Sequence, residues 1–528
     1  MIGRSQGMGW MLVLIAAALA VRVGLFFGGV RGSDAYAYAH QAYNIATGQY
    51  DVQAEAMFYG FRYTVLLPTA LAYKVAGVRD WSSALFPVVA SLVTLWLIIR
   101  LGSRLLDERT GLLAGLLYVF FPLDLPEATL VGPDSFIPML SAGSVLAFWV
   151  AGDEGKATRK SIALYALSGI CVGLAAQARE SCVLLLGSLA CLALYRRRWD
   201  AGLLALLPGC LAPLAVEAIY YWMYTGDPMY RATVIQKLNE LYVGPAPEGP
   251  TSWAYYPLAM FGLDLGGFAR FGFFVYAALG SVAVAAWRKQ LGCLTPLLLW
   301  AIPPLLYLEF GSMTLLRYVP IVKSYHYMSL ISPPLVLLSA YGLSGLLRPA
   351  AGSVSQPLWR RTAVGVMIVG LALTSLYGAY RVRQNLQDDA RPFVLVAESV
   401  QEHPERPIYV PHLRWAMFLN YHLRYQTGFN YYSRPNGVGS GRLRYLWEAP
   451  DPTVLPAAYV VLHDRYLFYD TIGRPVGRNA RLPDYVFSPP LSWRVVVRDR
   501  ADPPYNSFVL YETGRSADVT RTTPCCAG

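Results

Sequence analysis

The sequence predicts a polytopic α-helical membrane protein of about eleven transmembrane helices, followed by a C-terminal extracytoplasmic α/β domain. Composition is the first reason, because only 15% of the 528 residues are charged and 55% are hydrophobic, whereas about 25% of an average soluble protein is charged. The second reason is a series of apolar runs of roughly 17–25 residues, the length that crosses a hydrocarbon core. The third is a drop in hydrophobicity from residue 381 onward.

The expected spans occupy the first three quarters of the chain. They lie at 8–29, 82–100, 111–130, 134–151, 161–177, 181–195, 201–223, 269–287, 291–309, 326–347 and 362–380. The first run lacks a small-residue cleavage site before Asp34. We therefore expect a retained first helix and not a cleaved signal peptide.

Basic residues are concentrated in short loops between these spans, at 101–111, 152–160, 195–200, 287–292 and 348–361. Cytoplasmic loops carry such an excess of Lys and Arg, which accounts for the net charge of +11 without a nucleic-acid partner. We expect a cytoplasmic N-terminus, an extracytoplasmic C-terminus and a bacterial-type inner (cytoplasmic) membrane.

Two longer, Tyr-rich and Pro-rich loops, 30–81 and 224–268, then lie outside. We expect residues 1–380 to form the transmembrane domain and residues 381–528 a soluble α/β domain. Short β-type runs support the second domain, with an amphipathic helix at 394–403. These runs are PIYV (407–410), YVVL (459–462), WRVVV (493–497) and FVLYE (508–512).

The first external loop begins with GSDAYAYAHQAYNIATGQY (32–50). Tyr36, His40 and Tyr43 follow Asp34 at a spacing that places them on one helix face, and Gly48 is a typical helix stop. Two roles are open for Asp34. It is either the helix N-cap, which Asp often provides, or a functional carboxylate.

Several segments resemble the GT-C membrane glycosyltransferases, in the branch of the protein O-mannosyltransferases and the lipid A aminoarabinose transferase. They are GSDAYAY (32–38), FRYTVLLPTALAYKVAGV (61–78), LIIRLGSRLLDERTGLLAGLLYVFFP (97–122), TLVGPDSFIPMLSA (129–142), GLAAQARES (173–181) and KSYHYMSLISPPLVLLSAYGL (323–343). The resemblance covers residues 1 to about 350. One departure is Ala35, where family members often carry a second acid.

The resemblance implies transfer of a sugar from a polyprenyl-phosphate donor to an acceptor hydroxyl of a lipid, glycan or protein on the extracytoplasmic face, with inversion. Asp34 is then the catalytic base, because a positioned carboxylate can take the proton of the attacking hydroxyl. Since Ala35 removes the adjacent acid, Asp34 acts alone or with Glu55, Glu127 or Asp134.

Cations are expected at the departing phosphate, and the candidates at external helix ends are Arg179, Lys323 and Arg62. The alternative for each is snorkelling to lipid headgroups, which we expect for Arg317 and His326. The possible sugar-binding or acceptor-binding residues are Tyr36, His40, Tyr59, Tyr63, Glu127, Asp134 and Tyr327.

The sequence shows no metal-ligand spacing, so a divalent cation is possible but unsupported. A transporter or flippase for lipid-linked sugars is the main alternative, although we find no inverted repeat of the kind such proteins contain. A non-enzymatic scaffold for envelope assembly is a further alternative, which Ala35 keeps open.

Overall fold

The structure is a computed structural model. It describes residues 4–53, 58–154, 158–197, 201–242, 254–262, 265–312, 318, 320–321, 323–347, 357–427, 441–448, 457–464, 467, 482, 486–499 and 507–513. The chain divides into two compact units, Met1–Leu386 and Gln387–Gly528.

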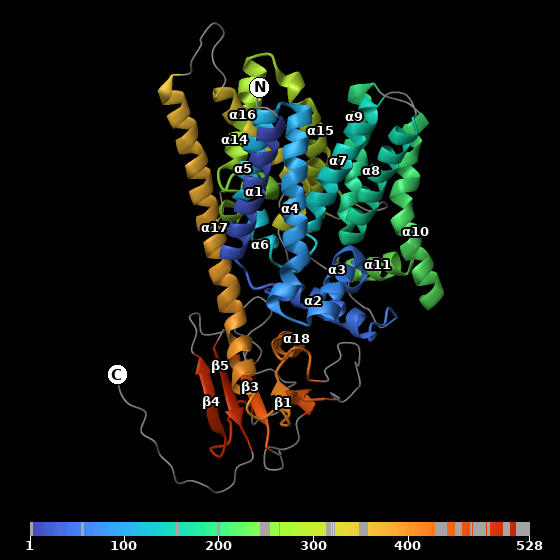
Figure 1. Ribbon diagram of the computed structural model, residues 1–528. Helices are drawn as coiled ribbons and strands as arrows, with labels where there is room; N and C mark the ends of the chain where they lie inside the picture. Colours follow the sequence, from blue (N-terminus) through green and yellow to red (C-terminus); the bar gives the residue numbers. More distant parts are fainter. Residues whose placement is uncertain are drawn as a thin grey trace. The chain divides into compact units, whose positions relative to one another are not determined.

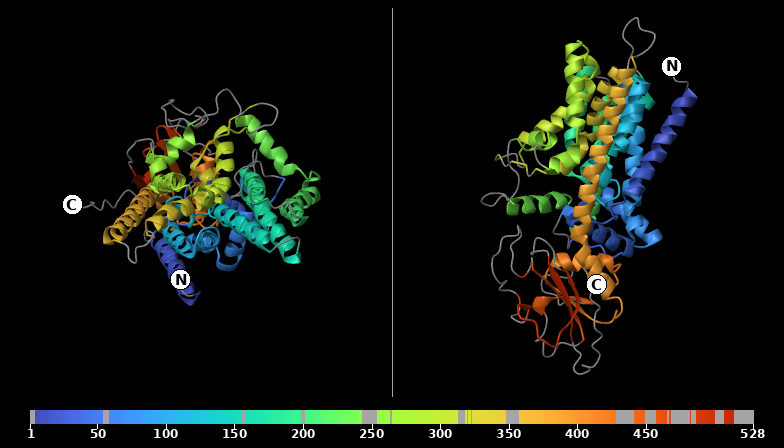
Figure 2. Two further views of the ribbon diagram at one scale, coloured as in Figure 1. Left: turned by 90° about the horizontal axis from the view of Figure 1, so that it is seen from above. Right: turned by 90° about the vertical axis from the view of Figure 1, so that its left-hand side faces the viewer.

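The first unit is a bundle of long helices that run roughly alongside one another (Figures 1 and 2). Each expected span contains a helix. These helices are α1 (Arg4–Gly24), α4 (Asp80–Leu105), α5 (Glu108–Val119), α7 (Phe136–Asp153), α8 (Arg159–Ala178), α9 (Leu185–Arg196), α10 (Leu206–Thr225), α14 (Phe274–Trp287), α15 (Thr295–Phe310), α16 (Ser332–Leu346) and α17 (Leu358–Ser399).

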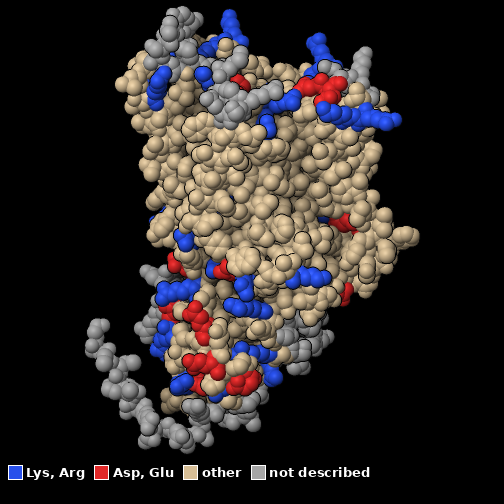
Figure 3. All heavy atoms as spheres, in the orientation of Figure 1, with Lys and Arg blue, Asp and Glu red and all other residues tan. Residues whose placement is uncertain are grey.

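Among the described residues, seven helical segments are long and apolar enough to cross a membrane. α14 and α15 are apolar but shorter, and α5 and α9 have 12 residues each. The fold class of a polytopic helical membrane protein is therefore confirmed, with fewer full-length spans than the eleven expected. Figure 3 shows why the surface suits a bilayer, because a broad band across these helices carries almost no charged residues.

The segment 30–81, expected to be the first external loop, contains α2 (Ser33–Thr47), a 3-10 turn η1 (Phe58–Phe61) and α3 (Tyr63–Ala76). Gly48 ends α2 with φ 73°, a left-handed conformation that glycine adopts without a Cβ clash, so the expected helix stop is confirmed. Of the two roles considered for Asp34, the N-cap is wrong, because Gly32 occupies that position without a side-chain cap and Asp34 lies in the first turn. The Asp34 carboxylate is therefore available for other contacts.

A buried polar network fixes the segment that follows α5. Arg22 of α1 is fully buried, and its guanidinium lies 2.6 Å from an Asp124 carboxylate oxygen. The hydroxyls of Ser91 and Tyr118 donate to the same carboxylate at 2.7 and 2.5 Å. Because Asp124 opens the short helix α6 (Asp124–Glu127), this network positions Glu127.

The second unit contains a five-stranded mixed sheet of order β2-β1-β3-β5-β4. Its strands are β1 (Ile408–Val410), β2 (Leu443–Tyr445), β3 (Tyr459–His463), β4 (Arg494–Asp499) and β5 (Phe508–Glu512). β1 pairs in parallel with β2 and β3, and β5 pairs antiparallel with β3 and β4. The four expected strands are confirmed, whereas β2 was not expected. The helix expected at 394–403 is not separate, because α17 continues to Ser399; α18 (Leu413–His422) completes the described helices of this unit.

Candidate functional site

A polar cavity of about 240 Å³ lies in the first unit, where segments that connect the long helices meet. The start of α2, the segment after α6, Arg179 and the last turns of α17 before residue 387 all contribute to its walls. Its charged and titratable lining residues are Arg31, Asp34, Tyr38, Glu127, Asp134, Arg179, Arg270 and His326. Asp34, Glu127, Asp134 and Arg179 were expected at the site, and the fold brings them together.

Asp34 is exposed at this cavity and accepts hydrogen bonds from neighbouring hydroxyls. Tyr59 donates to Oδ1 at 2.9 Å and Ser33 at 3.3 Å. Burial and the neighbouring Asp34 raise the pKa of the Tyr59 hydroxyl, so Tyr59 stays protonated and remains a donor. The Tyr38 ring packs edge-on against Tyr59, with 5.2 Å between the ring centroids. Asp34 forms no ion pair with any described residue, which leaves its carboxylate free to accept a proton.

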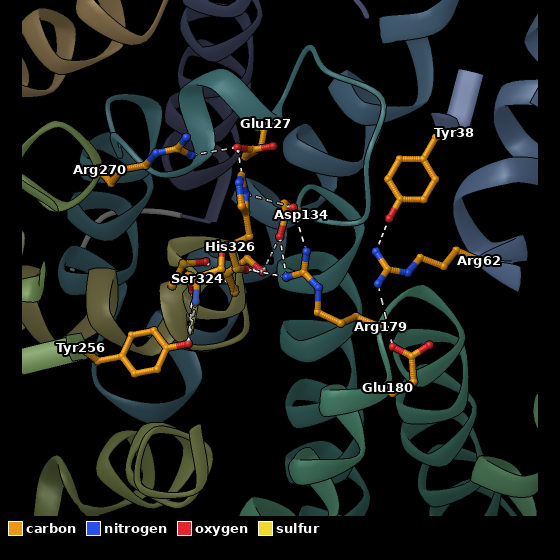
Figure 4. Close-up of polar contacts among 12 residues, drawn as sticks. Tyr38, Arg62, Glu127, Asp134, Arg179, Glu180, Tyr256, Arg270, Ser324 and His326 are labelled. Carbon is orange, nitrogen blue, oxygen red and sulfur yellow. Dashed lines mark hydrogen bonds and ion pairs between the residues drawn. The ribbon is translucent and has the colours of Figure 1, made fainter. Parts of the chain in front are cut away.

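Arg179 forms a two-pronged ion pair with Asp134, at 2.8 and 3.0 Å (Figure 4). It also donates to the His326 carbonyl at 2.6 Å, and the Tyr327 ring centroid lies 5.1 Å from the guanidinium carbon. Burial of the Asp134 carboxyl raises its pKa, but Arg179 and His326 together lower it more, so that pKa lies well below its usual range. The two side chains are therefore both charged in the folded protein.

Arg270, on α13 (Leu265–Phe271), pairs with Glu127 at 3.0 Å. The His326 ring lies between the two acids, with Nδ1 3.5 Å from a Glu127 oxygen and 3.4 Å from an Asp134 oxygen (Figure 4). Snorkelling was expected for His326, so that expectation is wrong. Arg270 was missed, although a charge inside an expected apolar span is a signal for function.

Two other expected cations do not line the cavity. Lys323 pairs with Glu309 at 2.7 Å, and both side chains are buried. Glu309 also accepts the backbone N–H of Tyr256 at 3.0 Å. Arg62 donates to the Tyr38 hydroxyl and lies 3.9 Å from Glu180. Arg62 thus reaches the site only through Tyr38, and Lys323 secures the segment that leads to His326.

The remaining expected residues either do not line the cavity or lie outside the described part of the chain. Tyr36 and His40 are buried in α2, and burial lowers the pKa of His40 to about 4. Tyr63 shares a hydrogen bond of 3.2 Å with Tyr50 and packs against Tyr220. Residues 55 and 317, both considered from the sequence, lie outside the described residues.

Comparison with known proteins agrees with this architecture. Residues 65–222 match the family model described as dolichyl-phosphate-mannose-protein mannosyltransferase. The ArnT of Cupriavidus metallidurans in the apo state superimposes with a TM-score of 0.60 at 17% identity, over 96% of this chain and 98% of that one. The chain has the GT-C fold. The fold that the resemblance implied is thereby confirmed.

Two further structures show the same GT-C fold. The same ArnT bound to undecaprenyl phosphate gives a TM-score of 0.62 at 15% identity, with 96% and 98% coverage of the two chains. The apo oligosaccharyltransferase of Archaeoglobus fulgidus gives 0.51 at 12% identity, over 88% of this chain and 70% of that one. No curated protein sequence matches the chain.

Within this GT-C fold, Glu127, Asp134 and His326 offer ligand atoms within 4.8 Å of one another. Two carboxylates and an imidazole suit a divalent cation. However, Arg179 already occupies both oxygens of Asp134, and Arg270 occupies one of Glu127. Among the described residues, the charges of the two acids are therefore balanced by two arginines.

Proposed function

We propose that the protein is a membrane glycosyltransferase that moves a sugar from a polyprenyl-phosphate donor to an acceptor hydroxyl on the extracytoplasmic face. One observation carries the proposal. A carboxylate without an ion-pair partner among the described residues, Asp34, lines the same 240 Å³ cavity as Arg179 and Arg270. A base and a cationic phosphate site are the two elements that this reaction requires.

The arginines would bind the donor phosphate and stabilise its developing charge. A guanidinium has five N–H donors, and the contacts of Arg179 with Asp134 and His326 use three. Arg270 uses one on Glu127. Donors therefore remain on both side chains, while the acids hold each guanidinium in a fixed orientation. Preorganised donors of this kind are worth more than mobile ones because they need no rearrangement during the reaction.

Asp34 would act on the acceptor. The acceptor oxygen forms a bond to the anomeric carbon as the bond from that carbon to the phosphate oxygen breaks. The hydroxyl proton passes to Asp34, and the polyprenyl phosphate leaves with the electron pair of the broken bond. Because attack and departure occur on opposite sides of the carbon, the configuration inverts. Tyr59, which donates to Asp34 at 2.9 Å, orients the carboxylate.

The proposal includes an orientation and a location. The short basic loops face the cytoplasm, as the distribution of Lys and Arg favours, and the cavity then opens toward the outer leaflet of an inner membrane. The donor headgroup enters from the lipid, and the acceptor is a lipid, glycan or protein. The fold of the ArnT that binds undecaprenyl phosphate supports a donor of this kind.

The test uses purified protein in liposomes with a panel of polyprenyl-phosphate sugars, and it follows release of the carrier. We expect turnover of one donor, with a loss of about 10²–10⁴-fold in Asp34→Asn. Asp51→Asn is the matched control, because Asp51 lies on the same loop but does not line the cavity. Equal losses in both variants would refute the role of Asp34. Transport of a donor across the bilayer without carrier release would favour a flippase instead.

A further inference from the structure

A second, larger cavity of about 490 Å³ lies between α14, α16 and α17 in the first unit. It shares no lining residue with the polar cavity that contains Asp34. Its walls are mostly apolar and include Met367 and Leu371, and its polar end is formed by Arg288 and Gln290. The volume falls within the range of roughly 300–1,000 Å³ that is typical of small-molecule sites.

Glycines create this space. An added Cβ at Gly280, Gly345 or Gly370 would meet no atom within 4 Å, so each glycine faces open volume. Gly342 behaves differently, since its added Cβ would lie 2.1 Å from Ser281 Oγ, and its N–H donates to that oxygen at 3.0 Å. α14 and α16 are therefore in close contact at Gly342, and an open cavity lies beside this contact.

Arg288 gives the cavity a charged end. It directly follows the last residue of α14, its side chain is exposed, and it forms no ion pair with any described residue. Lys289 follows it, and both belong to the short basic loop before α15. In the orientation proposed above, this loop faces the cytoplasm. Basic pockets between transmembrane helices on that side bind anionic lipid headgroups.

We propose that this cavity binds an anionic phospholipid of the cytoplasmic leaflet, with one acyl chain along the glycines and the phosphate at Arg288. The apolar walls lie within membrane helices, where hydrocarbon and not water is the surrounding medium. The unpaired cation favours an anionic headgroup over a zwitterionic one. Such a lipid would fill the gap between α14, α16 and α17 and stabilise their packing.

Native mass spectrometry of the full-length detergent-purified protein tests this, with phosphatidylglycerol and phosphatidylcholine as probes. We expect one retained phosphatidylglycerol per chain. Gly370→Leu should weaken its retention about tenfold by filling the cavity. Gly365→Leu is the matched control, because Gly365 lies on the same helix and also faces open space but does not line the cavity. Arg288→Gln should remove the preference for phosphatidylglycerol over phosphatidylcholine.

Four results would overturn the proposal. Equal retention of both phospholipids by the wild type would exclude recognition of the headgroup charge. Unchanged retention in Gly370→Leu, or an equal loss in Gly365→Leu, would place the lipid elsewhere. Displacement of phosphatidylglycerol by an equal concentration of polyprenyl phosphate would assign the cavity to the tail of the sugar donor. None of these results depends on transferase activity.

Discussion

The ion pair between Arg179 and Asp134 allows stability and activity to be separated. The two side chains are only 8% and 6% exposed. Replacement of one partner in such a buried pair costs roughly 3–5 kcal/mol, because an uncompensated charge remains. In Arg179→Met, Asp134 would retain the Ser329 hydroxyl at 3.1 Å and His326 at 3.4 Å. We therefore expect a destabilisation of about 3 kcal/mol, at the low end of this range.

The double variant Arg179→Met with Asp134→Leu should regain most of this stability, since an apolar replacement of both partners is often neutral. It should not regain activity, because the cation proposed for the donor phosphate is still absent. Loss of one preorganised donor costs about 10²–10³-fold in rate, and loss of a whole guanidinium should cost at least that. Unfolding in mixed detergent titrations and carrier release in liposomes measure the two effects.

A control and a pH dependence sharpen this prediction. Arg104→Met removes an exposed pair with Asp153 at 3.4 Å and should cost about 1 kcal/mol or less. Because Arg179 holds the pKa of Asp134 below its ordinary value of 3.8, the pair stabilises the folded wild type fully above that pH and loses this effect as pH falls below it. The double variant should lack that loss. Recovery of wild-type turnover in the double variant would refute the proposed role of Arg179.

Three further predictions concern the site and its support. Tyr59→Phe should lower turnover about tenfold, because it removes one hydrogen bond to a charged group, and the control Tyr307→Phe should leave turnover unchanged. Equal turnover of Tyr59→Phe and the wild type would show that Tyr59 does not orient Asp34. Burial lowers the pKa of His40 from 6.5 to about 4, so the imidazole takes up a proton at a higher pH in the unfolded chain than in the folded one. The stability of the folded protein should therefore decrease as pH falls from 6.5 to 4. Thermal unfolding of His40→Gln should show a weaker decrease, and an unchanged slope would contradict this. Gly169→Ala should destabilise the folded protein by about 1–3 kcal/mol, since the added Cβ would lie 2.1 Å from the Leu206 carbonyl oxygen. The control Gly187→Ala should not destabilise it, because an added Cβ there meets no atom within 4 Å. Similar stabilities of the two variants would argue against the close contact of α8 and α10.

Much of the architecture could be predicted because it depends on local patterns. Apolar runs marked the helices, Gly48 marked the end of α2, and short runs rich in β-branched and aromatic residues marked β1, β3, β4 and β5. β2 was missed because its sequence, Leu-Arg-Tyr at Leu443–Tyr445, contains no β-branched residue. The extent of α17 was also missed, since a helix that leaves the apolar environment continues as a polar one without a break in its backbone.

Asp34 and Arg179 were chosen as candidates because each is a charged residue at the end of an expected helix, and both line the cavity. Pairing could not be predicted, because it joins residues far apart in the chain. Lys323 looked equivalent to Arg179 in sequence, yet Glu309 neutralises it within the protein. His326 looked like an interfacial residue, yet it lies between Glu127 and Asp134. Only the fold shows which cations remain at the cavity.

Chemical rescue of Asp34→Ala tests the central proposal most directly, because a small carboxylate can replace a missing base but not a structural side chain. Carrier release from the selected donor would be measured with increasing formate, and with chloride at equal ionic strength. We predict that formate restores turnover with saturation while chloride does not, since formate can occupy the vacated space beside Tyr59 and accept the proton. Turnover in Asp34→Ala equal to that of the wild type without formate would contradict the assignment of Asp34 as the catalytic base.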